Sequence, residues 1–430
     1  MAREQVHVIG LSAAEPAAVW GIARDFCGKW HPAIASMQAE RGPNGELIRA
    51  FRVHGEDKTY RERLTYISDT DRTMAYAHVE GIEGIESYDA RLTVSTADEG
   101  GSVITMSATI TAPPKRAFEA AAGTTAIFED AVATLGRLAE SGTPARPPQP
   151  LPKPVSLTTR FIDDLPRLAI DLTPPRPGPL CLFLHGIGGG RSNWARQLGV
   201  IGHQTPAAAL DLRGYGDSTL GPRQSDVDDY CADILRVADV LGAQKLILCG
   251  LSYGSWIATS FAMRHPDRLA GLVLSGGCTG MSEAGPAERD AFRVSREVPL
   301  NAGQVPADFA PAVVKVIAGP DASADIRDEL QASMAAIPAA TYRDALICFT
   351  NPLEKFDFSK LTMPVLMMTG EYDRLAPPAE IRRVAERIFD TARNPDVRFE
   401  VIEGVGHVCN VEGAEQYTRT LSDFISKVAP

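Results

Sequence analysis

The stretch LILCGLSYGSW, residues 246–256, organises the interpretation of this chain. Its first residues are apolar and predict a short buried strand, and the residues from Trp256 onward predict a helix that ends just before Pro266. Between the two, Gly250 and Gly254 flank Ser252 at two positions on either side. A strand, a sharp turn with a central serine and a helix form the context of a nucleophile elbow.

The physical reason for this pattern is local. A serine in such a strained turn leaves room only for small residues two positions before and after it, and both are glycine here. Its hydroxyl then stands beside the N-terminus of a helix, where backbone N–H groups can stabilise a negatively charged oxygen. Cys249 comes before the turn, so it is excluded as the nucleophile of this elbow.

A second motif, LFLHGIGGG at residues 182–190, ends a predicted strand in a glycine-rich loop. Such a loop lets a backbone N–H point at a reacting oxygen without a side chain in the way. We expect Ile187 to supply one oxyanion donor and Tyr253, the residue after the serine, to supply the other. His185 is interpreted as a structural hydrogen-bonding residue of this loop, as are Asp211 and Arg213 in the later DLRG motif.

An acid and a base follow the serine in the chain. Asp373 comes after the predicted strand VLMMTG, and His407 lies in EGVGHVCN after the strand VRFEVIEG. The chain order Ser252, Asp373, His407 predicts a catalytic triad. Glu371 and, with less support, Asp357 compete for the role of the acid.

The second part of the chain, residues 156–430, alternates strand and helix patterns. The short strands are apolar on both faces, which predicts a mostly parallel sheet with helices on both faces. A helical insertion at about 278–358 is too long for a simple crossover and predicts a cap or lid. Trp194 and Trp256 are expected in the core.

The first part, residues 1–141, has a different order of predicted strands and helices. A strand and a helix with Pro16 in its first turn are followed by Thr-, Tyr- and Val-rich strands, and a long helix at about 115–141 ends the unit. This order predicts an α+β domain. The segment GTPARPPQPLPKPV, residues 142–155, carries six prolines and predicts an extended linker between two domains.

The second domain resembles the α/β-hydrolase superfamily through HGIGGGRSNW (185–194), DLRGYGDS (211–218), GLSYGS (250–255), GEYDRLAPP (370–378) and GVGHV (404–408). The resemblance implies the α/β hydrolase fold, and its lactonase, esterase and perhydrolase members are the most similar. Ser255 is a departure, because many members have a second glycine there. The first domain resembles the START-like, polyketide cyclase/dehydrase (SRPBCC) superfamily with its helix-grip fold. The features that carry this resemblance are the helix ending in Asp25-Phe26, the Trp30-His31-Pro32 segment and the long final helix.

The helix-grip resemblance implies an enclosed apolar cavity. The domain therefore either holds an apolar ligand or serves as a scaffold whose cavity is filled by side chains. Trp30 and His31 could face such a ligand, although packing is the more common role of such a pair.

Composition limits the partners. A net charge of −11 argues against nucleic acid, and no apolar run is long enough to span a membrane. Seven cysteines without C-x-x-C spacing indicate reduced thiols, and with no export signal evident we expect a cytoplasmic protein. The oligomeric state stays open, and no metal or organic cofactor is expected.

These observations predict a serine hydrolase that cleaves a carboxylic ester or lactone of a hydrophobic small molecule through an acyl-enzyme. A serine nucleophile disfavours the chemistry of haloalkane dehalogenases and epoxide hydrolases, which requires a carboxylate. Two alternatives stay open. One is a C–C bond hydrolase of β-diketone or vinylogous type with the same triad, and the other is a ligand-sensing protein with little turnover.

Overall fold

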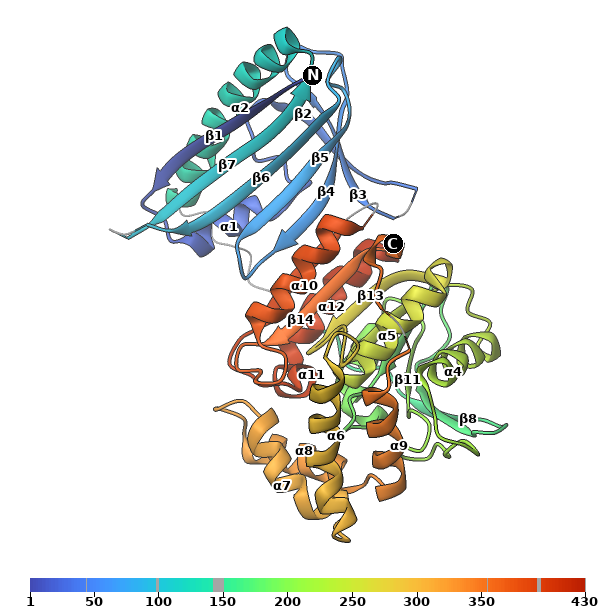
Figure 1. The fold of residues 1–430 in the computed structure, drawn as a ribbon. Coiled ribbons are helices and arrows are strands. Elements are labelled where there is room, and N and C mark those ends of the chain that lie inside the picture. The colour runs from blue at the N-terminus through green and yellow to red at the C-terminus, as the bar shows by residue number, and fades with distance from the viewer. Residues whose placement is uncertain (44, 98–99, 142–150, 354, 393–395, 430) are drawn as a thin grey trace. The chain divides into compact units, whose positions relative to one another are not determined.

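The computed structural model describes residues 1–430 apart from residues 44, 98–99, 142–150, 354, 393–395 and 430 (Figure 1). The chain forms two compact units, the first made of residues 1–149 and 394–399 and the second of residues 150–393 and 400–430. Most of the predicted linker, residues 142–150, lies outside the described residues. Its remainder belongs to the second unit, where the Val155 N–H donates to the Gly199 carbonyl at 2.9 Å.

The first unit is an antiparallel sheet with a long helix on one face. Its strand order is β1-β7-β6-β5-β4-β3-β2, and each neighbouring pair is antiparallel. The elements are β1 Ala2–Ser12, α1 Pro16–Ala23, β2 Ile34–Arg41, β3 Leu47–Val53, β4 Tyr60–Ser68, β5 Thr73–Glu80, β6 Ser87–Thr96, β7 Ser102–Ala112 and α2 Pro114–Glu140. This is the predicted helix-grip arrangement.

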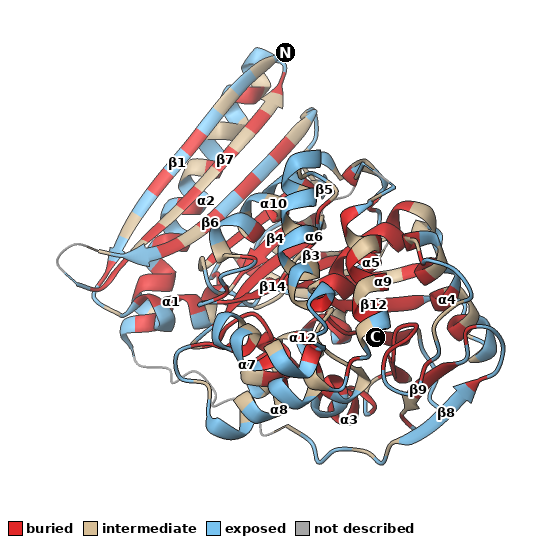
Figure 2. Ribbon diagram, turned by 60° about the horizontal axis from the view of Figure 1, so that its bottom comes forward, coloured by how far each residue is buried: buried red, intermediate tan, exposed pale blue. Residues whose placement is uncertain are grey.

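Alternation of side chains explains how the helix is held. In β7 every second residue is buried, among them Ile104, Met106 and Ile110. Along β1, exposed residues alternate with buried or half-buried ones (Figure 2). The buried stripe of α2, which includes Phe128 and Leu135, packs against this face. The core of the first unit therefore lies between the sheet and α2.

Two details differ from the expectation for this unit. The predicted first helix extends to Phe26, but α1 ends at Ala23. Strand β2 was not predicted, because only Ile34 in it is buried and Met37 is its only other large apolar side chain. An edge strand without an apolar face gives no period-two signal.

The second unit is a mostly parallel sheet in the order β8-β9-β11-β10-β12-β13-β14-β15. Strands β8 and β9 are antiparallel to their neighbours. The strands are β8 Thr158–Ile162, β9 Leu168–Leu172, β10 Leu180–Leu184, β11 Ala207–Leu210, β12 Leu246–Leu251, β13 Leu269–Ser275, β14 Val365–Gly370 and β15 Val397–Ile402. The order and the predominantly parallel pairing give the α/β hydrolase fold. Strand β8 was not predicted, because four of its five residues are exposed.

Helices pack against this sheet. Leu198 and Ile201 of α3 and Leu421 and Phe424 of α12 join Phe183 of β10 in one buried cluster. Helices α4 and α5 contact each other, and α5 packs on β12 and β13. The bounds are α3 Ala195–Ile201, α4 Val227–Val240, α5 Tyr253–Arg264, α10 Pro378–Thr391, α11 Cys409–Glu412 and α12 Ala414–Val428, with short 3₁₀ helices at Arg191–Trp194, Pro266–Arg268 and Phe358–Lys360.

Helices α6 to α9 lie between β13 and β14, within the predicted insertion, and gather beyond one end of the sheet (Figure 1). They are α6 Pro286–Asn301, α7 Pro306–Ile317, α8 Ala324–Ala335 and α9 Ala339–Thr350, and we call them the cap. Helix α7 pairs with α8, and α6 pairs with α9. Helix α9 was not predicted, because residues on most of its circumference are buried and leave no clear apolar stripe.

The core of the first unit gives a first prediction. We expect Phe128→Ala to destabilise this unit by about 3–5 kcal/mol, because a fully buried ring leaves a cavity. Phe118→Ala, at a position of α2 that is 71% exposed, should change stability by less than about 0.5 kcal/mol. Hydrogen exchange of peptides from β7 and α2 in the full chain measures both, and equal protection in the two variants would contradict this account.

Candidate active site

Ser252 sits in a strained turn between β12 and α5. Its backbone angles are φ 53° and ψ −112°, a region that residues with a side chain rarely adopt. Such strain costs of order 1–3 kcal/mol and persists only where the surroundings impose it. Here the Ser252 N–H donates to the Ser275 carbonyl of β13 at 2.7 Å, which holds the turn against the sheet.

The flanking glycines are required by contact distances. A Cβ atom at Gly250 would lie 2.3 Å from the Gly254 carbonyl oxygen, and one at Gly254 would lie 2.4 Å from the Leu184 carbonyl oxygen. Both distances are far below van der Waals contact, so no side chain fits at either position. The glycine spacing in the sequence therefore has a direct steric cause.

Ser255, the departure from the usual glycine, has a structural role. Its hydroxyl lies 2.8 Å from both the Gly250 and the Ser275 carbonyl oxygens and accepts the Ser275 N–H at 2.9 Å. The side chain is fully buried. It thereby ties the start of α5 to the ends of β12 and β13.

The structure brings together the three residues predicted for the triad. The Ser252 hydroxyl is 2.8 Å from His407 Nε2, and His407 Nδ1 is 2.8 Å from Asp373 Oδ2. With Nδ1–H donating to the carboxylate, Nε2 is left as the acceptor for the serine hydroxyl. The side chains of His407 and Asp373 are 7% and 0% exposed, so water has little access to their hydrogen bond.

Among the carboxylates considered from the sequence, Asp373 is the one in contact with His407. Its Oδ1 accepts the N–H groups of Leu375 and Ala376 at 2.8 and 2.9 Å, which leaves Oδ2 for the imidazole. Glu371 instead accepts the Gly404 N–H at 2.9 Å, and Asp357 caps a short helix through Ser359.

The two predicted oxyanion donors flank the serine. A Cβ atom at Gly186 would lie 3.4 Å from Ser252 Cβ, so the loop that carries Ile187 passes directly beside Ser252. Tyr253 is the first residue of α5, where an N–H has no acceptor within the helix. Among the backbone groups that the structure describes, neither the Ile187 nor the Tyr253 N–H donates to a carbonyl.

Side chains missed in the sequence hold this loop. The Tyr215 hydroxyl donates to the Ile187 carbonyl at 3.1 Å, which fixes the peptide plane next to the donor. The Arg191 N–H donates to Asp211 at 2.9 Å, and its guanidinium pairs with Asp211 and Asp217. The only sequence signal for Arg191 was its position directly after the glycine run.

His185 has the predicted structural role. Its Nδ1–H donates to the Gly186 carbonyl at 2.8 Å, and its Nε2 accepts the Leu212 N–H at 3.1 Å. Complete burial lowers the pKa of His185, which favours the neutral ring that this bonding pattern needs. The imidazole therefore links the glycine-rich loop to the DLRG loop.

Aromatic rings connect the elbow to the cap. Tyr253 and Trp256 of α5 each contact Phe349 of α9, with ring centroids 5.6 and 5.3 Å apart. Phe349 in turn contacts Phe292 of α6 at 5.9 Å. Trp194 and Trp256 are both fully buried, as predicted.

The cysteines are all free thiols. Cys249 is buried in β12, with its sulfur 3.6 Å from that of Cys181 on the neighbouring strand. Burial raises the pKa of the Cys249 thiol well above its ordinary value, which disfavours the reactive thiolate.

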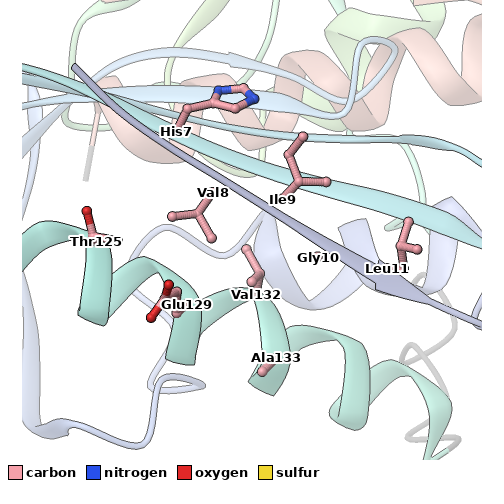
Figure 3. A pocket seen from close by; sticks show the side chains of 9 residues that line it. All are labelled: His7, Val8, Ile9, Gly10, Leu11, Thr125, Glu129, Val132 and Ala133. Carbon is pink, nitrogen blue, oxygen red and sulfur yellow. The ribbon is translucent and has the colours of Figure 1, made fainter.

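In the first unit, a cleft of about 490 Å³ lies between β1 and α2 (Figure 3). Val8 points from β1 toward the helix, whereas His7, Ile9 and Leu11 point away from it. The cleft is lined by His7, Val8, Ile9, Gly10, Leu11, Thr125, Glu129, Val132 and Ala133.

The interior of this unit is partly polar. Arg49 forms an ion pair with Glu62 at 2.6 Å, and its guanidinium lies 4.5 Å from the ring centroid of Tyr76. His31 is buried and accepts the Ala33 N–H at 3.1 Å, whereas Trp30 is half-buried and packs against the core. An apolar ligand in this unit stays a prediction.

Within the described ranges, no group of three or more His, Cys, Asp or Glu side chains is arranged to hold a metal ion. In the part of the chain that the structure describes, no helix combines the length and apolar character needed to cross a membrane.

Comparison with known families agrees with this geometry. Residues 181–420 match the alpha/beta hydrolase family, which is more than half of the chain. The chain belongs to the alpha/beta hydrolase family. Residues 6–141 of this alpha/beta hydrolase match the family described as polyketide cyclase / dehydrase and lipid transport, so the chain joins two domains of different families.

Individual relatives of this alpha/beta hydrolase are distant. The candidate carbamate hydrolase RutD of Pseudomonas savastanoi pv. phaseolicola is 24% identical over 58% of this chain and 94% of its own length. Epoxide hydrolase B of Mycobacterium tuberculosis is 34% identical over 24% of this chain and 30% of its own length. A thermophilic esterase of Thermogutta terrifontis has a TM-score of 0.56 and 23% identity, and the match covers 64% of this chain and 99% of the esterase.

The elbow gives a second prediction. We expect Ser255→Ala to lower the free energy of unfolding by about 1–3 kcal/mol, because the buried Ser275 N–H loses its acceptor. Ser295→Ala, at an exposed position of α6, is the matched control and should have little effect. Urea unfolding measures both, and equal midpoints for Ser255→Ala and wild type would contradict the role given to Ser255.

Proposed function

We propose that this alpha/beta hydrolase is a serine hydrolase that cleaves a carboxylic ester or lactone of a hydrophobic small molecule through an acyl-enzyme. The observation that carries the proposal is the continuous hydrogen-bonded path from Ser252 through His407 to buried Asp373. The two N–H groups beside the serine add the donors that acyl transfer requires.

In the first half of the reaction, Ser252 Oγ forms a bond to the carbonyl carbon while its proton passes to His407 Nε2. The carbonyl double bond opens, and the negative oxygen is held by the N–H groups of Ile187 and Tyr253. In other enzymes, removal of one such donor raises the activation barrier by about 2.7–4 kcal/mol. Asp373 stabilises the imidazolium that forms and keeps the His407 Nδ1–H directed toward its own carboxylate.

In the second half, His407 gives its proton to the leaving alcohol oxygen as the carbon–oxygen bond breaks. The acyl group then remains on Ser252. Water loses a proton to His407 as it attacks the ester, and this proton returns to Ser252 when the acid departs. Atoms and charge balance over the cycle, and the chain supplies every catalytic group.

The choice of a hydrophobic substrate rests on the aromatic side chains that pack where the elbow helix meets the cap. Tyr253, Trp256, Phe292 and Phe349 join the elbow helix to two helices of the cap. Specificity pockets for small molecules are mostly apolar with few polar groups. The epoxide hydrolase match does not change the proposed chemistry, because a serine stands at the turn where that reaction needs a carboxylate.

Hydrolysis of p-nitrophenyl esters with acyl chains of 2 to 12 carbons tests the proposal. We expect turnover by the wild type and a loss of about 10⁴-fold or more in kcat for Ser252→Ala, because the nucleophile is removed. Turnover that persists in the variant would contradict a serine mechanism. No turnover by either protein would contradict ester cleavage and favour the C–C hydrolase or ligand-sensing alternative.

The identity of the acid is tested by a matched pair of neighbouring carboxylates. Asp373→Asn should lower kcat by about 10³- to 10⁴-fold, because an amide favours the wrong tautomer of His407. Glu371→Gln should leave kcat close to that of the wild type, because the amide oxygen can still accept the Gly404 N–H. Equal losses in the two variants would contradict the assignment.

A further inference from the structure

The cap holds the backbone of the proposed general base. The His407 N–H donates to the carbonyl of Ile317 at 2.7 Å. Ile317 is the last residue of α7, and the carbonyl groups at the end of a helix have no N–H donor within the helix. The end of a cap helix therefore fixes the peptide from which the catalytic imidazole extends.

A second contact joins the same two segments through one carboxylate. Glu412 Oε2 accepts the N–H of Gly406 at 3.1 Å and the N–H of Gly319 at 2.7 Å. Gly406 directly precedes His407, and Gly319 follows the end of α7. Glu412 is half-buried, and burial raises its pKa more than the two N–H groups and the nearby Arg327 guanidinium lower it. Arg327 also donates to the Gly319 carbonyl at 2.9 Å.

The backbones of the two segments touch with no room for a side chain. A Cβ atom at Gly406 would lie 2.2 Å from the Ile317 carbonyl oxygen. One at Gly319 would lie 2.8 Å from the Gly406 nitrogen. This close approach means that a small shift of the cap turn at residues 317–319 is passed directly to the peptide of His407.

Helix α8, which pairs with α7, contacts the glycine-rich loop that carries Ile187. Asn193 Nδ2 donates to the Ser333 hydroxyl at 3.0 Å, and the Met334 sulfur lies 3.2 Å from where a Cβ of Gly188 would be. The α7–α8 pair is thus in contact with the segment that carries His407 and with the glycine-rich loop that carries Ile187.

We propose that Glu412 is a positioning residue for His407, and that with it the cap turn at 317–319 sets the orientation of the base toward Ser252. This inference rests on the proposed serine hydrolase function. It assigns to the cap a part in the chemical step, in addition to any part in substrate binding. Loss of the contact should therefore lower kcat and leave KM unchanged, because the proton transfer is misaligned while the pocket remains.

The first test compares variants of two glutamates. Glu412→Ala should lower kcat for a p-nitrophenyl ester by about 10- to 100-fold, the loss expected from a displacement of about 1 Å. Glu412→Gln should restore most of the activity, because its amide oxygen can still accept both N–H groups. Glu415→Ala is the control, since Glu415 is 73% exposed and pairs only with Arg419 among the described residues.

The second test approaches the contact from the cap side, so that a folding defect in Glu412→Ala does not decide the matter. Gly319→Ala places a methyl group against Gly406 and should reproduce the loss in kcat. Gly285→Ala is its control, because a Cβ there meets no atom within 4 Å. The rate at which a fluorophosphonate probe labels Ser252 should fall in parallel, because labelling also needs the base but not the natural substrate.

The outcomes separate the two proposals. Labelled wild type and unlabelled Ser252→Ala, together with wild-type kcat in both Glu412→Ala and Gly319→Ala, would overturn the positioning role alone. A raised KM with unchanged kcat in these two variants would also overturn the positioning role. A wild type that neither reacts with the probe nor hydrolyses esters would overturn both the positioning role and the proposed function.

Discussion

The strained turn at Ser252 is the constraint on which the rest of the site depends. A φ of 53° at a residue with a side chain is unfavourable, so neighbouring elements must hold it in place. They do so through the Ser275 carbonyl and the buried hydroxyl of Ser255. The turn brings Ser252 Oγ to 2.8 Å from His407 Nε2 and leaves the Tyr253 N–H at the first position of a helix. One backbone conformation thus presents both the proposed nucleophile and one of the two proposed oxyanion donors.

Close approach of backbones recurs through the second unit. At the elbow, Gly254 lies against the carbonyl of Leu184. Directly before His407, Gly406 lies against the carbonyl of Ile317. In both places the absence of a side chain lets two segments touch that are far apart in the sequence. Packed contacts of this kind transmit displacement because protein interiors are dense. The same physical argument underlies the proposal that the cap turn at 317–319 positions the imidazole of His407.

Much of the candidate site was predictable from the sequence, for a physical reason. The turn around Ser252 is local, and its steric demand appears in the sequence as glycines at fixed spacing. Asp373 and His407 each follow an apolar strand, and in a parallel sheet the carboxyl ends of strands meet at one edge. Edge strands were not predictable, because β2 and β8 each bury only one of their residues and carry no periodic signal.

The sequence by itself determined the two-domain organisation, the elbow and the chain order of the candidate nucleophile, acid and base, because these follow from local sterics and strand patterns. Tertiary structure decided what depends on long-range distance. It distinguished Asp373 from Glu371, since only the folded chain brings one of the two carboxylates to His407. It also placed Glu412 between the cap and the base loop, a contact that joins Gly319 and Gly406 across some ninety residues of sequence. No periodicity encodes such a pairing, because it arises only when the packed helices and the sheet meet.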